Sequence, residues 1–170
     1  YNIIIKIYIM KKPSAFLDRD GVINHDRGYI HKFSDFKLRK GVIKGLQLLT
    51  KKGYMIFIVT NQGGIGKGLY TESDFLTLHS KIDKFLKKKK IKIREVKFSP
   101  FHPKAKIKKF RKKSNTRKPG NLMIKQIIKK WPVDLKKSFM IGDRLSDKKC
   151  AKKSKLYFEY AKNNFHSQIK

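Results

Sequence analysis

Short, almost wholly apolar runs alternate along this chain with longer stretches in which apolar residues recur every three or four positions. The short runs suit strands that are buried on both faces, and the periodic stretches suit helices with one buried face. The apolar runs predict strands at 15–17, 55–59, 138–141 and 156–158, and we expect a further strand at 95–98. The periodic stretches predict helices at 41–52, 71–90, 122–131 and 146–153. Strands that alternate with helices predict an α/β fold, in which helices cover both faces of a parallel sheet.

Two of the predicted helices have distinctive ends. Gly53 follows the last apolar position of the helix at 41–52 and suits its C-terminal cap. Thr71 suits the N-cap of the next helix, with Asp74 three positions later. Because no repeat and no Gly/Ser/Pro-rich linker divides the sequence, we expect one domain that spans residues 1–170.

The beginning of the chain is apolar, but the run is too short for a membrane-spanning helix, which needs about 20 apolar residues. It contains Lys6 and lacks the small-residue cleavage site of a signal peptide. Met10 lies just before the first motif, so we interpret residues 1–9 as an extension. The single cysteine, Cys150, excludes a disulfide within the chain and suits a reducing compartment, so we expect a cytoplasmic protein.

The chain carries 44 Lys and Arg residues against 12 Asp and Glu, a formal net charge of +32. An excess of this kind is typical of proteins that bind nucleic acid or another polyanion. Only seven of these basic residues are arginine, although arginine is favoured for gripping guanine and phosphate with paired hydrogen bonds. Because Ile and Asn are abundant as well, we attribute the lysines mainly to an AT-rich genome, with steering of an anionic substrate as a by-product.

Two carboxylates follow the first predicted strand, at Asp18 and Asp20, and Gly21 then allows a turn. Asp18 can attack phosphorus as a carboxylate, and Asp20 can protonate the leaving oxygen and then activate water. An anionic nucleophile needs a cation beside it when it approaches a phosphate, and Mg²⁺ suits such oxygen ligands. The same pattern also fits a simple acidic turn after a strand, so it does not decide the function alone.

Polar residues also follow two other predicted strands. Thr60 and Asn61 come after the strand at 55–59, and the glycines that follow let backbone amides approach a phosphoryl group. This segment matches neither a P-loop nor a dinucleotide-binding pattern. Asp143 follows a later strand and can complete a metal site. Asp147, four residues on, either lies on the same side of a helix as Asp143 or is an acid favoured by the helix dipole.

Lys118 supplies a fixed positive charge that can neutralise the phosphoryl group in the transition state, and Arg117 can hold a substrate phosphate or hydroxyl. A basic pair is weak evidence in a chain with this much lysine. The order is the stronger signal, because nucleophile, hydroxyl, lysine and metal-binding acid follow one another along the chain near predicted strand ends. Ligands of parallel sheets bind beyond the carboxyl ends of the strands.

Four segments carry a family resemblance in combination. They are Asp18-Arg19-Asp20-Gly21-Val22-Ile23-Asn24, Gly28-Tyr29-Ile30-His31, Thr60-Asn61-Gln62 with Gly64, Ile65 and Gly68, and Arg117-Lys118-Pro119. Residues 14–153 resemble the haloacid-dehalogenase-like phosphatase superfamily, and within it the branch of D-glycero-D-manno-heptose 1,7-bisphosphate 7-phosphatases and histidinol phosphatases. The resemblance implies a Rossmann-like three-layer fold without a large cap domain.

The resemblance also implies a set of roles. Mg²⁺ would be held by the Asp18 carboxylate, the Asp20 backbone carbonyl and the Asp143 carboxylate. The phosphoryl group would be bound by Thr60 and Lys118. The substrate would be placed by Asn61 and Arg117.

One segment departs from this branch, whose members often hold a structural zinc in a Cys-Pro-His-His-Pro loop followed by Cys-x-Cys-Arg-Lys-Pro. The matching positions are Ser99-Pro100-Phe101-His102-Pro103 and Ser114-Asn115-Thr116-Arg117-Lys118-Pro119. All three cysteines and the ligand histidine are replaced, so we do not expect zinc. The loop must then be held in another way.

We therefore expect a Mg²⁺-dependent hydrolase of carbohydrate metabolism that removes the 7-phosphate of a heptose 1,7-bisphosphate through an aspartyl-phosphate. Its partner would be a small sugar phosphate rather than a membrane or nucleic acid, and we expect a monomer. Two alternatives stay open. One is a phosphatase for histidinol phosphate or for the 3′ end of a polynucleotide, and the other is a non-enzymatic polyanion-binding module on the same fold.

Overall fold

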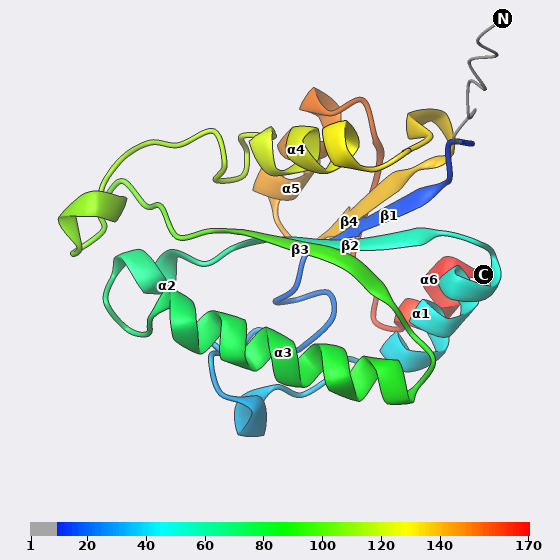
Figure 1. The fold of residues 1–170 in the computed structure, drawn as a ribbon, viewed down its shortest axis with the longest axis horizontal. Helices are drawn as coiled ribbons and strands as arrows, with labels where there is room; N and C mark the ends of the chain where they lie inside the picture. The colour runs from blue at the N-terminus through cyan, green and yellow to red at the C-terminus, as the bar shows by residue number, and fades with distance from the viewer. Residues whose placement is uncertain (1–9) are drawn as a thin grey trace, which may run out of the picture.

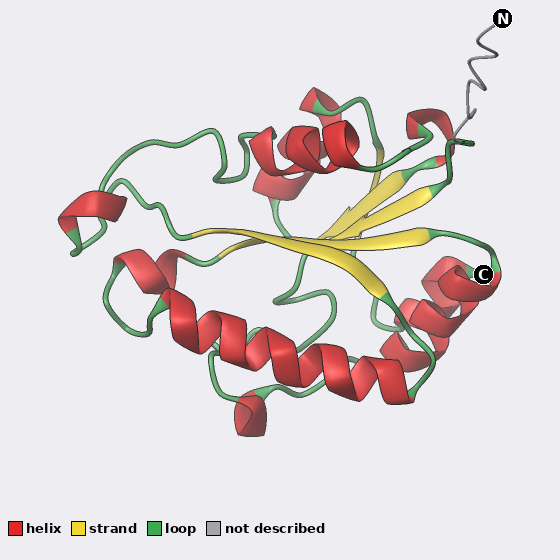
Figure 2. Ribbon diagram, in the orientation of Figure 1, coloured by secondary structure: helices red, strands yellow, loops and turns green. Residues whose placement is uncertain are grey.

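The computed structural model describes residues 10–170, so the predicted extension at 1–9 lies outside the described residues. Five parallel strands form one sheet in the order β3-β2-β1-β4-β5 (Figures 1 and 2). The strands are β1 (Ser14–Leu17), β2 (Met55–Asn61), β3 (Ile93–Ser99), β4 (Phe139–Gly142) and β5 (Tyr157–Tyr160). Each of the five predicted strands is present, and the α/β prediction is confirmed.

The strand order reverses beside β1. The chain builds outward from β1 to β2 and β3, and then returns to place β4 on the other side of β1. Such a reversal opens a crevice at the carboxyl ends of the two central strands, where ligands of open α/β sheets bind. Asp18 directly follows β1, and Asp143 directly follows β4. The topology therefore places both acids at the crevice.

Helices cover both faces of the sheet (Figure 1). The helices of residues 10–170 are α1 (Val42–Lys51), α2 (Gly63–Gly66), α3 (Glu72–Lys88), α4 (Leu122–Lys130), α5 (Leu145–Lys153) and α6 (Phe165–Ile169). Short 3₁₀ turns occur at Phe33–Asp35, Lys108–Phe110 and Leu135–Lys137. In this part of the chain no connection forms a further sheet or helical layer that could act as a large cap. No helix in it is both long and apolar enough to cross a membrane.

Alternate side chains of β1 enter two separate apolar cores. Ala15 and Leu17 pack with α1, α3 and α6, whereas Phe16 packs with α4 and α5 on the other face. A third, smaller apolar cluster lies beyond the carboxyl end of the sheet, and its buried members are Ile65, Tyr70, Phe75, Ala105 and Phe110. Burial on both faces explains why β1, β2 and β4 are nearly continuous apolar runs, whereas the edge strands β3 and β5 are partly exposed and include charged residues.

Local signals fixed the ends of the long helices. The side-chain oxygen of Thr71 accepts a hydrogen bond from the backbone N–H of Asp74, and the Asp74 carboxylate accepts one from the backbone N–H of Thr71. This capping box satisfies two of the backbone donors at the start of α3. Gly53 follows α1 with a positive φ of 79°, which glycine adopts without strain. Both predicted helix ends are confirmed.

Two short helices were not predicted. The turn of α2 contains three glycines, and glycine is a poor helix former. It forms because Gly64 and Gly66 leave room for Tyr70 and for the 100–110 segment to pack closely against it. The five residues of α6 are too few to show a helical period. Phe165 holds this helix in place by packing against Gly45 in α1.

Candidate active site

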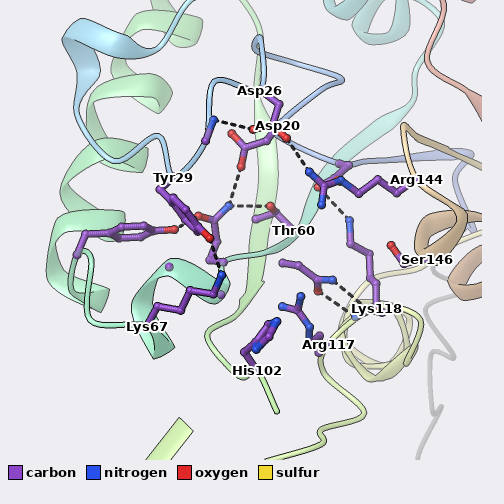
Figure 3. A pocket seen from close by; sticks show the side chains of 17 residues that line it. Asp20, Asp26, Tyr29, Thr60, Lys67, His102, Arg117, Lys118, Arg144 and Ser146 are labelled. Atoms are coloured by element: carbon purple, nitrogen blue, oxygen red, sulfur yellow. Dashed lines mark hydrogen bonds and ion pairs between the residues drawn. The ribbon is translucent and has the colours of Figure 1, made fainter. Parts of the chain in front are cut away.

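A cavity of about 430 Å³ opens at the carboxyl ends of β1 and β2, and Figure 3 shows side chains of several elements converging on it. Six of the seven predicted site residues line it: Asp18, Asp20, Thr60, Asn61, Arg117 and Lys118. The seventh, Asp143, lies beside Asp18 in an acidic cluster at the same crevice. The fold thus brings together segments that are separated by as many as 125 residues of sequence.

The centre of the site is a buried lysine between two carboxylates. Nζ of Lys118 lies 2.9 Å from Oδ1 of Asp18 and 2.6 Å from Oδ1 of Asp147. It also donates a hydrogen bond of 2.8 Å to the carbonyl oxygen of Val59. A buried ammonium is costly unless it is paired and hydrogen-bonded, and here both conditions are met. Lys118 is therefore held as a fixed positive charge beside the predicted nucleophile.

Burial and neighbouring charges shift the pKa values of these groups. Burial raises the pKa of Asp18 to about 6, and the charge of Asp147 adds to this rise while Lys118 opposes it. Burial alone would lower the pKa of Lys118, but the charges of Asp18 and Asp147 outweigh it and raise that pKa. Burial and the charge of Asp147 also raise the pKa of Asp143. Three carboxylates near one lysine therefore leave an excess of negative charge that favours a bound cation.

Carboxylate oxygens of Asp18, Asp143 and Asp147 lie within 4.8 Å of one another. Gly21 and Gly142 permit this convergence, because a Cβ atom at either position would clash with Asp143 or Asp147 respectively. Oxygen-only ligands are those preferred by Mg²⁺, so the donor set fits this ion. The contribution of the Asp20 backbone carbonyl to the metal site stays a prediction.

Asp147 is a site residue whose main contact the sequence did not indicate. Its Oδ2 accepts a hydrogen bond of 3.0 Å from the backbone N–H of Arg144 and so caps α5, as one of the two interpretations expected. Its Oδ1 pairs with Lys118 at the same time. The four-residue spacing suggested that Asp143 and Asp147 lie on one side of a helix. It gave no sign of the ion pair between Asp147 and Lys118, which are 29 positions apart in the sequence.

Thr60 and Asn61 differ in where their side chains are engaged. The hydroxyl of Thr60 lines the cavity and accepts a hydrogen bond of 2.8 Å from the Gln62 amide. The amide of Asn61 is bonded twice to the backbone of Lys118: Nδ2 donates to its carbonyl at 3.0 Å, and Oδ1 accepts from its N–H at 2.9 Å. The structure thus uses Asn61 to fix the chain at Lys118, although Asn61 also borders the cavity.

Asp20 is enclosed by hydrogen-bond donors. Its carboxylate accepts hydrogen bonds from Arg19, Asn24 and Gln62. None of these three residues was assigned a role from sequence. Arg19 and Asp20 are neighbours in the sequence, but this adjacency alone does not indicate that their side chains pair.

Basic side chains line the outer part of the cavity. They are Lys67, Arg117 and Arg144, with His102 beside them (Figure 3). Arg117 donates to the carbonyl of Phe101 at 3.1 Å, and Arg144 pairs with Asp26 at 2.7 Å. Burial, followed by the charge of Arg144, lowers the pKa of Arg117, which nevertheless stays charged because free arginine has a pKa above 12. The cavity therefore suits an anionic substrate.

The loop at 99–116 is held by hydroxyl groups and apolar contacts. At the three positions for which the family resemblance implied cysteine, Oγ1 of Thr116 lies 3.1 Å from Oγ of Ser99 and 2.8 Å from Oγ of Ser114. The fourth position is Phe101, whose ring packs edge-on against Phe110. Neutral hydroxyls and a phenyl ring do not replace thiolate and imidazole as zinc ligands. The residues present therefore do not fit zinc.

Comparison with known proteins supports these observations. A family model described as polynucleotide kinase 3 phosphatase matches residues 15–170. The chain belongs to this family of haloacid-dehalogenase-like phosphatases. It is 38% identical over 142 residues to the D-glycero-beta-D-manno-heptose-1,7-bisphosphate 7-phosphatase of Rhodopseudomonas palustris, which covers 84% of this chain and 79% of that protein. It is 37% identical over 139 residues to the protein of the same name from Escherichia coli K12, and this match covers 82% of this chain and 73% of that protein.

Solved structures agree on the fold. A HAD-like phosphatase from Mesorhizobium loti superposes with a TM-score of 0.80 at 27% identity, covering 86% of this chain and 70% of that one. The D,D-heptose 1,7-bisphosphate phosphatase from B. bronchiseptica, solved with magnesium and phosphate, superposes with a TM-score of 0.79 at 22% identity. The match covers 92% of this chain and 84% of that one. The family resemblance and the Rossmann-like fold are confirmed.

Proposed function

We propose that this protein is a Mg²⁺-dependent phosphatase that hydrolyses a phosphomonoester through a phospho-Asp18 intermediate, with a heptose 1,7-bisphosphate as its substrate and the 7-phosphate as the group removed. The observation that carries the proposal is the Asp18–Lys118–Asp147 arrangement beside Asp143, at the inner end of a cavity with basic walls. The relatives at 37–38% identity support the substrate, because both are named for this 7-phosphatase activity.

In the first half of the reaction, a carboxylate oxygen of Asp18 attacks phosphorus and the ester P–O bond breaks. The leaving alkoxide takes a proton from the carboxyl group of Asp20. Lys118 neutralises negative charge on the transferring phosphoryl group, and the hydroxyl of Thr60 donates to it. Arg117 binds the remainder of the anionic substrate at the outer wall.

In the second half, the carboxylate of Asp20 takes a proton from water while the water oxygen attacks the phosphorus of phospho-Asp18. The bond between phosphorus and Asp18 breaks, phosphate leaves, and Asp20 again carries the proton for the next turnover. Mg²⁺ held by Asp18, Asp143 and the Asp20 backbone carbonyl would offset the repulsion between nucleophile and phosphate. We also propose that the protein acts as a cytoplasmic monomer, for which the free, buried thiol of Cys150 suits a reducing compartment.

The test is release of phosphate, with Mg²⁺ and with chelator, from heptose 1,7-bisphosphate, histidinol phosphate and a 3′-phosphorylated oligonucleotide in parallel. We expect Mg²⁺-dependent release that strongly prefers the heptose and is abolished by Asp18→Asn. The matched control is Asp83→Asn, a surface acid on α3 that pairs with Lys87, and it should retain full activity.

The oligonucleotide is the main competing substrate, because the matching family model is described by a polynucleotide phosphatase and the net charge is +32. Preference for the oligonucleotide would overturn the heptose assignment while leaving the chemistry intact. Absence of Mg²⁺-dependent release from all three substrates, with DNA binding that weakens steeply as salt rises, would support a non-enzymatic polyanion-binding module instead.

A further inference from the structure

Among residues 10–170, Arg19 is the largest fully buried side chain, with none of its surface exposed. It does not line the cavity, so it cannot contact a substrate bound there. Its guanidinium lies 5.6 Å from the centroid of the Phe75 ring and donates a hydrogen bond of 2.8 Å to the carbonyl of Ile30. Its charge partner is Asp20, which it contacts through both Nε and Nη2 at 2.8–3.1 Å.

A buried ion pair adds little stability over apolar residues of the same volume, because both charges lose their hydration. Stability therefore does not explain why an arginine occupies this position. One partner, however, is the carboxylate that borders the cavity. The paired hydrogen bonds of a guanidinium fix both the position and the plane of a carboxylate.

Gln62 links the same carboxylate to Thr60. Its Nε2 donates to Oδ2 of Asp20 at 3.0 Å and to Oγ1 of Thr60 at 2.8 Å. Its Oε1 accepts from Nη2 of Arg19 at 3.3 Å and from the hydroxyl of Tyr70. If the amide of Gln62 were flipped, its NH₂ group would face the N–H donor of Arg19 and its oxygen would face the carboxylate of Asp20. These partners therefore allow only one orientation of the amide.

We propose that Arg19 and Gln62 are positioning residues for the acid–base group Asp20, a role that rests on the proposed phosphatase function. Arg19 fixes the plane of the carboxyl group, and Gln62 sets its position relative to Thr60, where the phosphoryl group binds. Asn24 adds a donor at 2.9 Å to Oδ1 of the same carboxylate. Proton transfer requires an approach of about 2.6–3.2 Å between heavy atoms, so a carboxyl group free to rotate would spend little time in range.

The proposal has a consequence that a merely structural role lacks. Breaking the P–O bond of an alkyl phosphate releases a basic alkoxide, which needs the proton of Asp20. Breaking that of p-nitrophenyl phosphate releases a stable phenolate, which needs no proton. A loss of positioning should therefore slow the first half of the reaction for the alkyl ester and spare the aryl ester.

The experiment is single-turnover release of the leaving group, measured for heptose 1,7-bisphosphate and for p-nitrophenyl phosphate with Gln62→Leu, which keeps the volume but removes the amide. We expect release from the heptose to fall about 10–100-fold, within the range of one general acid, and release from the aryl ester to change by less than about threefold. Tyr70→Phe, which removes one donor to Gln62, should show the same selectivity with a smaller loss. Gln47→Leu, a surface glutamine on α1 that bonds to Lys89, is the matched control.

Arg19→Met is the stronger perturbation but threatens folding, so Gln62→Leu and Tyr70→Phe decide the outcome once thermal unfolding shows that they fold. Equal losses for both substrates would show a structural role and overturn the proposal, and so would full activity on the heptose. A wild-type protein that releases nothing from either substrate would instead overturn the proposed function and this role with it.

Discussion

Phe110 should control the order of the basic loop at 99–116, in which His102 lines the cavity. Its ring is 7% exposed and packs with Phe101 and Ala105, while its backbone carbonyl accepts from the N–H of His102 at 3.1 Å. Replacing a buried Phe by Ala costs about 3–5 kcal/mol. We take the lower end, about 3 kcal/mol, because a surface loop can partly collapse into the space.

Trypsin is a suited probe, because this loop is rich in its cleavage sites. They are Lys104, Lys106, Lys108, Lys109, Arg111, Lys112 and Lys113. When local opening is fast, cleavage follows the population of the open loop, and about 1.4 kcal/mol corresponds to a factor of ten. Phe110→Ala should therefore raise the rate of cleavage in the loop about 100-fold, measured by mass spectrometry of the first fragments.

The control is Ile107→Ala in the same loop, where the side chain is 37% exposed and the expected rise is below about tenfold. Equal cleavage rates for the two variants would refute the reasoning. The hydroxyl chain of Ser99, Ser114 and Thr116 would then be the contact that holds the loop.

Three further predictions concern charged groups. Asp147→Asn should lower the free energy of unfolding, measured by urea denaturation, by about 3 kcal/mol, because it removes one of the charges that pair with buried Lys118. The control, Asp83→Asn, should lower it by less than about 0.5 kcal/mol. The pKa of His79 is lowered to about 3, first by burial and then by the charge of Arg19. Below about pH 6.5, His79 therefore binds more protons in the unfolded chain than in the folded one. The free energy of unfolding should fall as the pH drops from about 6.5 toward 3, by up to about 1.4 kcal/mol per pH unit. His79→Gln should flatten that part of the pH profile. Mg²⁺ at about 100 times its Kd should raise Tm by about 5–10 °C, and Asp143→Asn should remove most of that shift; an unchanged shift would exclude Asp143 as a ligand.

The sheet and the long helices were predictable from the sequence alone. Strands buried on both faces must be apolar throughout, and amphipathic helices must repeat every three to four residues, so both leave a mark that is local in the chain. The start of α3 was equally predictable, because the Thr71–Asp74 capping box lies within one turn of the chain. The short helices α2 and α6 left no such mark, since each forms only where another segment packs against it.

The same division holds for the site. Asp18, Thr60 and Asp143 could be selected because each follows an apolar run, and the carboxyl ends of parallel strands meet at one edge of a sheet. What each side chain bonds to was decided by tertiary structure alone. Lys118 pairs with Asp147, and Arg19 and Gln62 enclose Asp20 across 43 positions of sequence. A hydrogen bond depends on the distance and direction between two groups, and no periodic pattern records these when the partners belong to segments that only the folded chain brings together.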